Sequence, residues 1–537
     1  MYKQGLYHDW VPKLLQLLLI IVTFLPFMAV SCVYSSNIID MSSGMGEISE
    51  AFSFASNAMF IGMAGAMPLL IRTKPYFRSK EIVVGGLVIM SLLCYVTSTT
   101  DNVYVIAFAS LLMGFFKMFG TIEFILPIYF IITPKMDRKR FYPIFYPLAI
   151  IIGQYAGFYM GSLAYRMFWE HTNLVAIIYC LSCALLSLVF MHNSRGMKKM
   201  PFYQFHWTSL LLFFAMMMVL NYVLTFTKFH GWFQSEVIWW GTVAFFVMLV
   251  IFVAFQLSIK RPFMDMGGFS KKNVIHSLVM IALMGLFVSS GSMQNTYMMG
   301  VLGYSSLLTN QINLAMFPGA IIGGIICFFW LRRNLDLKEL VMIGFGAYLV
   351  AHIILYFTIA PVVQVSFFIL PTILKGIGLC VLYISLAIYC SQRLTNNQML
   401  SAMAILVMVR SFVGQALFGS ILAWAFYKLQ LQNLTNLASH MDAADFMGQL
   451  RGGGLMLYKS TQLQAIMLAV KQLLGYTIIA GFVILIYIAL HRFGSTRYRR
   501  IVIMRKRVKG YSIRGYQTNG RKKKEEQAIE DVTPVAM

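Results

Sequence analysis

Residues 236–257 read EVIWWGTVAFFVMLVIFVAFQL, and no charged residue follows Glu236 until Lys260. A helix needs about 20 apolar residues to cross the hydrocarbon core of a bilayer. The apolar residues here do not alternate with polar ones, as they would in a half-buried strand, and they leave no polar helical face. The stretch therefore predicts a membrane-spanning helix.

Stretches of this kind recur along all 537 residues of the chain. Hydrophobic residues make up 59% of the sequence and charged residues 12%, whereas an average soluble domain has about 25% charged residues. A soluble protein of this length would need more charge to cover its surface. We expect an all-α integral membrane protein with about fourteen transmembrane helices, at 14–35, 52–71, 81–99, 103–132, 142–165, 173–191, 207–226, 236–257, 274–296, 307–330, 339–358, 362–390, 401–427 and 467–490.

Lys and Arg are concentrated in every second connection between these predicted helices. The connections after even-numbered helices, together with the N-terminus, hold 21 basic residues, and the alternate connections hold five: Arg166, Lys228, Lys428, Arg451 and Lys459. Short basic loops stay on the cytoplasmic side of a membrane. We therefore expect both termini in the cytoplasm and a bacterial-type inner (plasma) membrane as the location.

The same composition argues against several other classes of function. The net charge is +24, but its position in short loops and in the tail after Arg492 suits contact with anionic lipid better than with nucleic acid. The seven cysteines lie in or beside apolar stretches and have no metal-binding spacing. No phosphate-binding glycine-rich loop and no catalytic constellation is recognisable. We expect no enzyme activity, no metal site and no cofactor.

The first six predicted helices weakly resemble the last six. A glycine-containing helix with a basic loop after it occurs as both the second and the tenth, and a lysine among glycines occurs in the fourth (Lys117) and the twelfth (Lys375). The seventh and eighth helices have no counterpart. This pattern is typical of parallel halves joined by an inserted pair. It predicts a cytoplasmic N-terminus (1–13), a six-helix half (14–191), an inserted pair with its linkers (192–272), a second six-helix half (273–490) and a basic cytoplasmic tail (491–537).

Two motifs carry a resemblance to a known family. Gly153, Gly157 and Gly161 recur at intervals of four in the fifth helix, and Arg410 begins the run Arg-Ser-Phe-Val-Gly in the thirteenth. With the helix plan, these motifs resemble the fourteen-span drug:proton antiporter branch of the major facilitator superfamily over about residues 14–490. The loop after the second helix departs from the family pattern because it lacks the usual Asp. The resemblance implies proton-coupled export of a small amphipathic or anionic compound by alternating access.

The resemblance also implies roles for individual residues. It places Lys117 and Lys375 on opposing walls of a central cavity at similar depth. It makes the three glycines a close-packed or sliding surface between the halves, and it gives Arg410 the role of holding the thirteenth helix. The polar outer loop 428–466 is similar to that of transporters that work with a periplasmic adaptor. A passive connector is the alternative for this loop.

Glu123 is the one acidic residue deep within a predicted helix. A carboxylate in an apolar site can change its charge near neutral pH, as a proton-coupled carrier requires. Glu123 is therefore the candidate for proton coupling, and the alternative is a structural ion pair with a basic residue of another helix. A cavity with two lysines and one glutamate favours anionic substrates. Gln294, Asn295 and Asn310 are candidate polar contacts for the substrate, unless they only satisfy helix ends.

Two histidines within helices, His276 and His352, could titrate, although packed and hydrogen-bonded histidines are more common in such positions. The alternatives to an exporter are an importer of an organic anion or short peptide and, from another class, a membrane-embedded enzyme or an assembly platform. The expected partners are a small-molecule substrate, the lipid bilayer and, through the outer loop, an adaptor.

Overall fold

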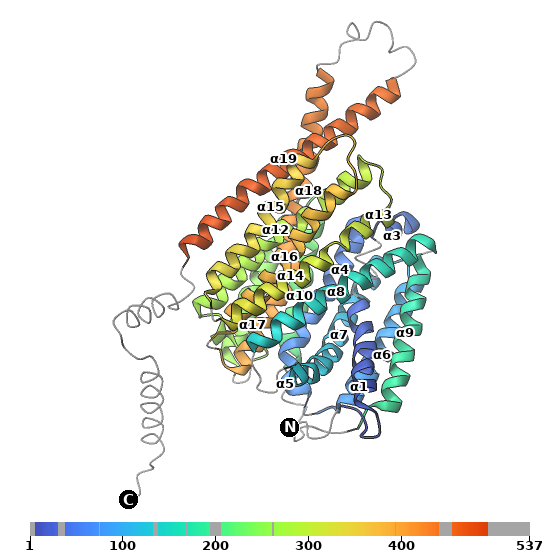
Figure 1. Cartoon of the computed structure of the whole chain (residues 1–537), viewed down its shortest axis with the longest axis vertical. Coiled ribbons are helices and arrows are strands. Elements are labelled where there is room, and N and C mark those ends of the chain that lie inside the picture. Colours follow the sequence, from blue (N-terminus) through green and yellow to red (C-terminus); the bar gives the residue numbers. More distant parts are fainter. Residues whose placement is uncertain are drawn as a thin grey trace, which may run out of the picture.

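The computed structural model describes residues 6–30, 38–74, 76–132, 138–167, 169–193, 206–259, 262–333, 335–392, 394–439 and 454–491. Within these ranges the chain forms helices joined by short connections (Figure 1). Thirteen helices of this part are long and apolar enough to cross a membrane, and a shorter apolar helix precedes them. The predicted all-α membrane fold is confirmed.

Every predicted stretch overlaps a helix or a group of consecutive helices. In chain order these are α1 (Lys13–Ala29), α3 (Ile38–Met45), α4 (Ser49–Ala66), η1 (Met67–Leu69), α5 (Leu70–Thr73), α6 (Ser79–Thr99), α7 (Val103–Ile132), α8 (Arg138–Arg166), α9 (Trp169–Phe190), α10 (Trp207–Phe226), η3 (Trp232–Gln234), α11 (Glu236–Ser258), η4 (Met266–Gly268), α12 (Lys272–Gly300), α13 (Ser306–Asn313), α14 (Met316–Arg332), α15 (Leu337–Thr358), α16 (Ser366–Cys390), α17 (Asn396–Met408), η5 (Val409–Val413), α18 (Gly414–Ser439) and α19 (Gly454–Leu490).

The helices pack as two halves with a pair between them. In the first half α4 packs on α7, and α6 packs on α7 and α9; in the second, α16 packs on α14 and α15, and α19 packs on α15 and α18. The inserted helices α10 and α11 pack against each other, and α10 also contacts α4 and α18. Figure 1 shows α1, α6, α7 and α9 on one side and α12, α14, α15 and α19 on the other.

Glycines set the closest helix crossing at matching places in the two halves. A Cβ at Gly62 would lie 2.0 Å from a backbone oxygen of α7, and one at Gly114 would lie 1.9 Å from a backbone oxygen of α4. Between α14 and α16, the corresponding distances are 2.1 Å at Gly319 and 2.5 Å at Gly376. Small residues let membrane helices approach closely. The two halves thus repeat one packing solution, in agreement with the weak sequence repeat.

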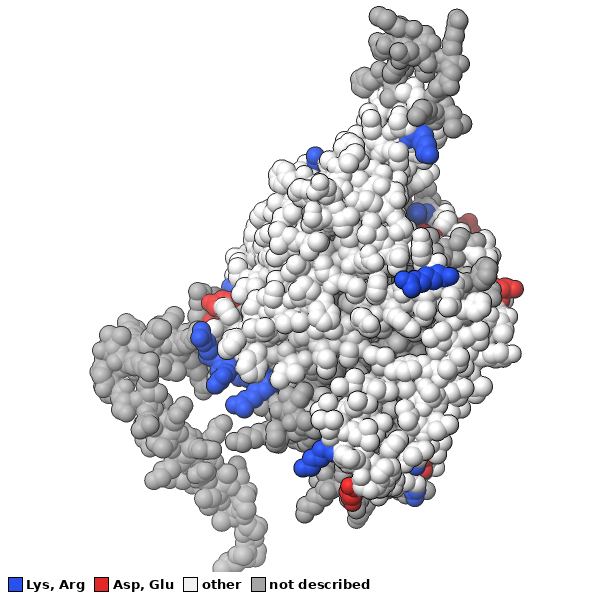
Figure 2. Space-filling view, turned by 45° about the vertical axis from the view of Figure 1, so that its right-hand side comes forward, with Lys and Arg blue, Asp and Glu red and all other residues white. Residues whose placement is uncertain are grey.

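The halves meet where α8 of the first packs on α14 and α16 of the second, and where α4 packs on α17. At the α8–α14 crossing a Cβ on Gly324 would lie 2.4 Å from the ring of Pro147 and 2.9 Å from the carbonyl oxygen of Pro143. The visible face in Figure 2 carries few charged side chains, as expected for a surface that contacts lipid.

The predicted outer loop 428–466 requires a correction. Helix continues from Asn396 to Ser439, and α19 begins at Gly454, so most of the supposed loop extends two membrane helices. Their ends project together beyond the other helices (Figure 1), and the Asn433 side chain donates a hydrogen bond to Gln472 Oε1 at 3.0 Å between them. Polar residues suggested a loop, but Leu and Gln, which are frequent here, are good helix formers. Residues 440–453 lie outside the described part.

Candidate functional site

The site is built around Lys375, a lysine near the middle of α16. Its side chain is only 8% exposed, and its Nζ donates a hydrogen bond to Oε1 of Gln294 on α12 at 2.6 Å. Within the described ranges no carboxylate lies within ion-pair distance of Lys375. An ammonium in a membrane interior is costly and normally faces a partner or a polar passage. Lys375 therefore has unused capacity to bind an anion.

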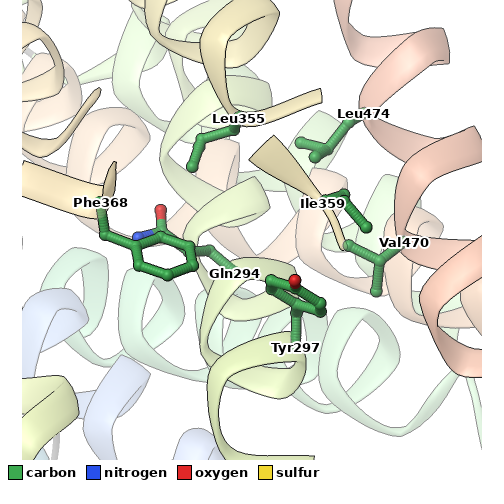
Figure 3. A pocket seen from close by; sticks show the side chains of 7 residues that line it. All are labelled: Gln294, Tyr297, Leu355, Ile359, Phe368, Val470 and Leu474. Atoms are coloured by element: carbon green, nitrogen blue, oxygen red, sulfur yellow. The ribbon is translucent and has the colours of Figure 1, made fainter. Parts of the chain in front are cut away.

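A small pocket lies beside this hydrogen bond, between α12, α15, α16 and α19. It has room for about one water molecule. Figure 3 shows the Gln294 amide beside the ring of Phe368, with aliphatic side chains completing the wall. The seven lining residues are Gln294, Tyr297, Leu355, Ile359, Phe368, Val470 and Leu474. A substrate-sized molecule needs these helices, or the halves, to move apart.

His352 lies in the same half and is fully buried. Its Nδ1 is 2.7 Å from the carbonyl oxygen of Tyr348, and its Nε2 is 2.5 Å from Oγ of Ser290. A carbonyl oxygen only accepts, so Nδ1 carries the proton. Both ring nitrogens thus have partners, which is the packed and hydrogen-bonded arrangement that the sequence left open.

Lys117 occupies the matching place in the first half and is 3% exposed. Lys117 and Lys375 each lie 15 residues before the last residue of their helix, Ile132 and Cys390 (132 − 117 and 390 − 375). That separation corresponds to about 22 Å along a helix. Both lysines are buried, and they belong to different halves; that they line opposing walls of a cavity at similar depth stays a prediction. Among the predicted polar contacts for the substrate, Gln294 accepts the hydrogen bond from Lys375. Asn295 on α12 and Asn310 on α13 are half-buried.

Glu123 lies in an ion pair. Its Oε2 is 3.4 Å from Nζ of Lys74, the residue that follows α5, and the two side chains are 4% and 22% exposed. Glu123 is nine residues before the end of α7 at Ile132, which is about 13 Å along the helix axis. Glu123 therefore lies nearer to the centre of α7 than to its end. The sequence could not name Lys74 as the partner, because Lys74 follows a different helix, 49 residues before Glu123.

The glycine row on α8 is only partly explained by packing. Within the described ranges, a Cβ at Gly153 would meet no atom within 4 Å. Close helix packing therefore does not account for Gly153 in this conformation, and the role of the glycine row as a sliding surface stays a prediction. Gly157 is half-buried and Gly161 is buried on the same helix.

Arg410 lies in η5, a short π-helical segment between α17 and α18. Its guanidinium carbon is 4.3 Å from the ring centroid of Tyr383 on α16 and 5.9 Å from that of Tyr146 on α8. The residue thus contacts both halves, which goes beyond the predicted role of holding one helix. Sequence reasoning missed both tyrosines, since they are two among 28 tyrosines in the chain.

His276 and His491 meet at one end of the second half. Their ring centroids are 4.0 Å apart, and His276 Nδ1 lies 3.0 Å from the hydroxyl of Tyr487. The Lys338 ammonium donates a hydrogen bond to the carbonyl oxygen of Ala489 beside them. Burial, and then the neighbouring His276 and Lys338, lower the pKa of His491, which lies directly after α19.

No protein-family model matches the sequence, and no curated protein matches it either. Solved structures do match in fold. The nucleoside transporter NupG has a TM-score of 0.52 and 13% identity, with 89% of this chain and 99% of that chain covered. A peptide transporter, POT, has a TM-score of 0.56 and 11% identity (88% and 94% covered). A POT family transporter in complex with 5-aminolevulinic acid has a TM-score of 0.54 and 14% identity (87% and 95% covered).

These proteins belong to different transporter groups, and their similarity does not single out the drug:proton antiporter branch. At 11–14% identity the similarity concerns the fold. The chain therefore has the fold of these transporters.

Proposed function

We propose that the protein is a secondary active transporter that moves a small anionic or amphipathic compound across a membrane by alternating access. The observation that carries this proposal is the buried Lys375 ammonium, whose hydrogen bond goes to the Gln294 amide instead of a carboxylate. An anionic group of the substrate would supply the missing counter-charge. Lys117, a buried lysine of the other half, is the second cation that we assign to the passage.

The simpler alternative is that Lys375 has only a structural role and binds no substrate. A charge at the centre of a membrane helix costs about 2.5–3.5 kcal/mol on insertion scales. A leucine or glutamine at this position would avoid that cost. Retaining a lysine with an amide as its partner is easier to understand if an anion binds there during each cycle.

For the coupling, we propose proton-driven export through Glu123. Protonation of this carboxyl group would break its 3.4 Å ion pair with Lys74 and free α5 from α7. Because an ion pair of this kind also stabilises a fold without any role in coupling, the two roles must be separated by experiment. We place the protein in a bacterial-type inner membrane with both termini cytoplasmic.

A second candidate is import of an organic anion or a short peptide. Its support is that peptide transporters recur among the solved structures of this fold. Import and export require the same anion site and differ in the direction of the driving gradient. Transport from either side of a vesicle distinguishes them.

The test uses purified protein in liposomes and follows uptake of radiolabelled organic acids, with 5-aminolevulinic acid, the ligand of one fold neighbour, and benzoate as first probes. We expect Lys375→Gln to reduce uptake at least tenfold and Lys375→Arg to restore part of it, because the positive charge is retained. Lys459→Gln, a change at an exposed lysine outside the passage, is the matched control. Uptake that Lys375→Gln leaves unchanged would overturn the proposal.

A further inference from the structure

A guanidinium lies where the two halves meet, and its surroundings leave it incompletely paired. Arg410 belongs to the second half, and it stacks on Tyr383 of that half and approaches Tyr146 of the first. The two tyrosine rings are themselves 6.2 Å apart. A side chain at this junction changes its neighbours when the halves rock against each other.

The hydrogen bonds of Arg410 are not all satisfied. Its Nε is buried and has no hydrogen-bond partner within the described ranges, where no carboxylate pairs with the guanidinium either. A buried N–H donor without an acceptor costs about 1–3 kcal/mol. Stacking on an aromatic ring offsets about 0.5–2 kcal/mol. The rings therefore shield the charge, but they leave the Nε–H without an acceptor.

The backbone at Arg410 is also irregular. Residues Val409–Val413 form a π-helical turn inside an otherwise continuous helix from Asn396 to Ser439. Such turns are rare, and they are found often at functional sites. The sequence shows a plain apolar helix here, so helix propensity does not account for the turn. The π-helical turn carries Arg410, whose side chain approaches Tyr146 of the other half. This arrangement is consistent with a binding role for Arg410.

We infer that Arg410, flanked by Tyr146 and Tyr383, is a binding site for the carboxylate of an organic acid with an aromatic or apolar body. The planar guanidinium presents Nε–H and an Nη–H in the geometry that a carboxylate accepts in two parallel hydrogen bonds. The tyrosine rings provide faces against which an apolar body packs. The inference rests on the proposed transport function and names the class of its substrate.

This site is separate from the Lys375 site. Tyr383, the ring on which Arg410 stacks, lies eight residues after Lys375 on α16 (383 − 375), about 12 Å along the helix axis. The passage then holds two cations in succession: Lys375 near the middle of α16, and Arg410 of η5 beside Tyr383, nearer to the end of α16. An acid that leaves one site can reach the other when the halves change their contacts.

The experiment measures how matched acid and amide pairs (benzoate with benzamide, phenylacetate with phenylacetamide) raise the thermal midpoint of the purified full-length protein in detergent. We expect the acids to stabilise the wild type and the amides to have no effect. Arg410→Lys keeps the charge but loses the planar donor pair, and it should weaken the apparent affinity for the acids at least tenfold. Arg333→Lys, at an exposed arginine, is the matched control.

A second measurement does not depend on the folding of a variant. Phenylglyoxal modifies accessible arginines, and mass spectrometry of the wild type reports modification at each position. Benzoate should protect Arg410 and leave Arg333 unprotected. Equal modification of Arg410 with and without benzoate would overturn the inference.

The possible failures can be told apart. If Lys375→Gln abolishes stabilisation by the acids while Arg410→Lys responds like the wild type, the Arg410 site is wrong and the proposed function stands. If Arg410→Lys loses the response, the inference is supported. If neither acid stabilises the wild type or is taken up by its liposomes, both the inference and the proposed anion transport are overturned.

Discussion

Replacing Glu123 with glutamine separates a coupling role from a structural one, because glutamine keeps the size of the side chain but has no titrating group. The paired atoms, Glu123 Oε2 and Lys74 Nζ, are 3.4 Å apart. Two unit charges at this distance attract by about 5 kcal/mol at an effective dielectric constant of about 20. Desolvation of both groups opposes this attraction, and Lys74 remains 22% exposed and can be hydrated.

The net coupling should therefore be well below the Coulomb value. We expect about 2 kcal/mol from a double-mutant cycle of Glu123→Gln and Lys74→Met, which is within the usual range for residues in contact. The stability term is measured by unfolding in mixed detergent micelles. If the cycle gives a coupling within about 0.3 kcal/mol of zero, the pair does not hold α5 against α7 in the way we infer.

The coupling role is measured in liposomes with an imposed pH gradient, using the acid probe that the wild type accumulates. Glu123→Gln should still bind the probe and equilibrate it, but it should lose accumulation driven by the gradient, because glutamine cannot take up and release a proton. Lys74→Met is the control that breaks the ion pair and retains the carboxyl group. A Glu123→Gln protein that still accumulates the probe against its gradient removes Glu123 from the coupling mechanism.

Three further predictions follow from the packing. Gly114→Ala should destabilise the protein by about 1–3 kcal/mol, because the new Cβ would lie 1.9 Å from a backbone oxygen. Gly153→Ala should leave the unfolding midpoint unchanged, because its Cβ would meet no described atom within 4 Å. Equal effects of the two substitutions would refute the crossing geometry. Because the pKa of His491 is lowered in the folded protein, the unfolded protein binds a proton at this histidine more readily. The free energy of unfolding should therefore fall as pH drops below about 6.5. His491→Asn should reduce this loss, and parallel curves of thermal midpoint against pH would contradict it. Replacing 428–466 with a short Gly/Ser linker should abolish export in cells and preserve uptake in liposomes if the projecting helices bind an adaptor; intact cellular export would make them a passive extension.

Much of the fold could be predicted from hydropathy and loop charge. The run at 236–257 became α11 (Glu236–Ser258), and every other predicted stretch overlaps a helix. Sequence patterns also singled out Lys117 and Lys375, both of which are buried. The predicted bounds of the outer loop were wrong, because a polar composition does not exclude helix where Leu and Gln continue its periodicity and where a partner helix supplies a contact such as Asn433 to Gln472.

The contacts of the candidate site could not be predicted. Glu123 pairs with Lys74, 49 residues away, and Arg410 stacks on Tyr383 and approaches Tyr146, which comes from the other half. The sequence of one helix does not indicate which cation or aromatic ring of another helix a given side chain will contact. Likewise, the presence of Gly153 in a glycine row did not reveal that the space beside it is open.

The physical reason is that membrane helices are specified by neighbouring residues in the sequence, whereas side-chain contacts depend on segments far apart in the sequence. A bilayer of fixed thickness requires about 20 consecutive apolar residues and backbone hydrogen bonds satisfied within each helix, so the existence and approximate position of each membrane helix are properties of short, continuous sequence. Side-chain partners depend on how each helix is rotated, tilted and shifted against its neighbours, and one residue changes the direction of a side chain by about 100°. Those variables are decided by packing among all the helices together, and therefore only the tertiary structure placed Lys375 on Gln294 and Arg410 between two tyrosines.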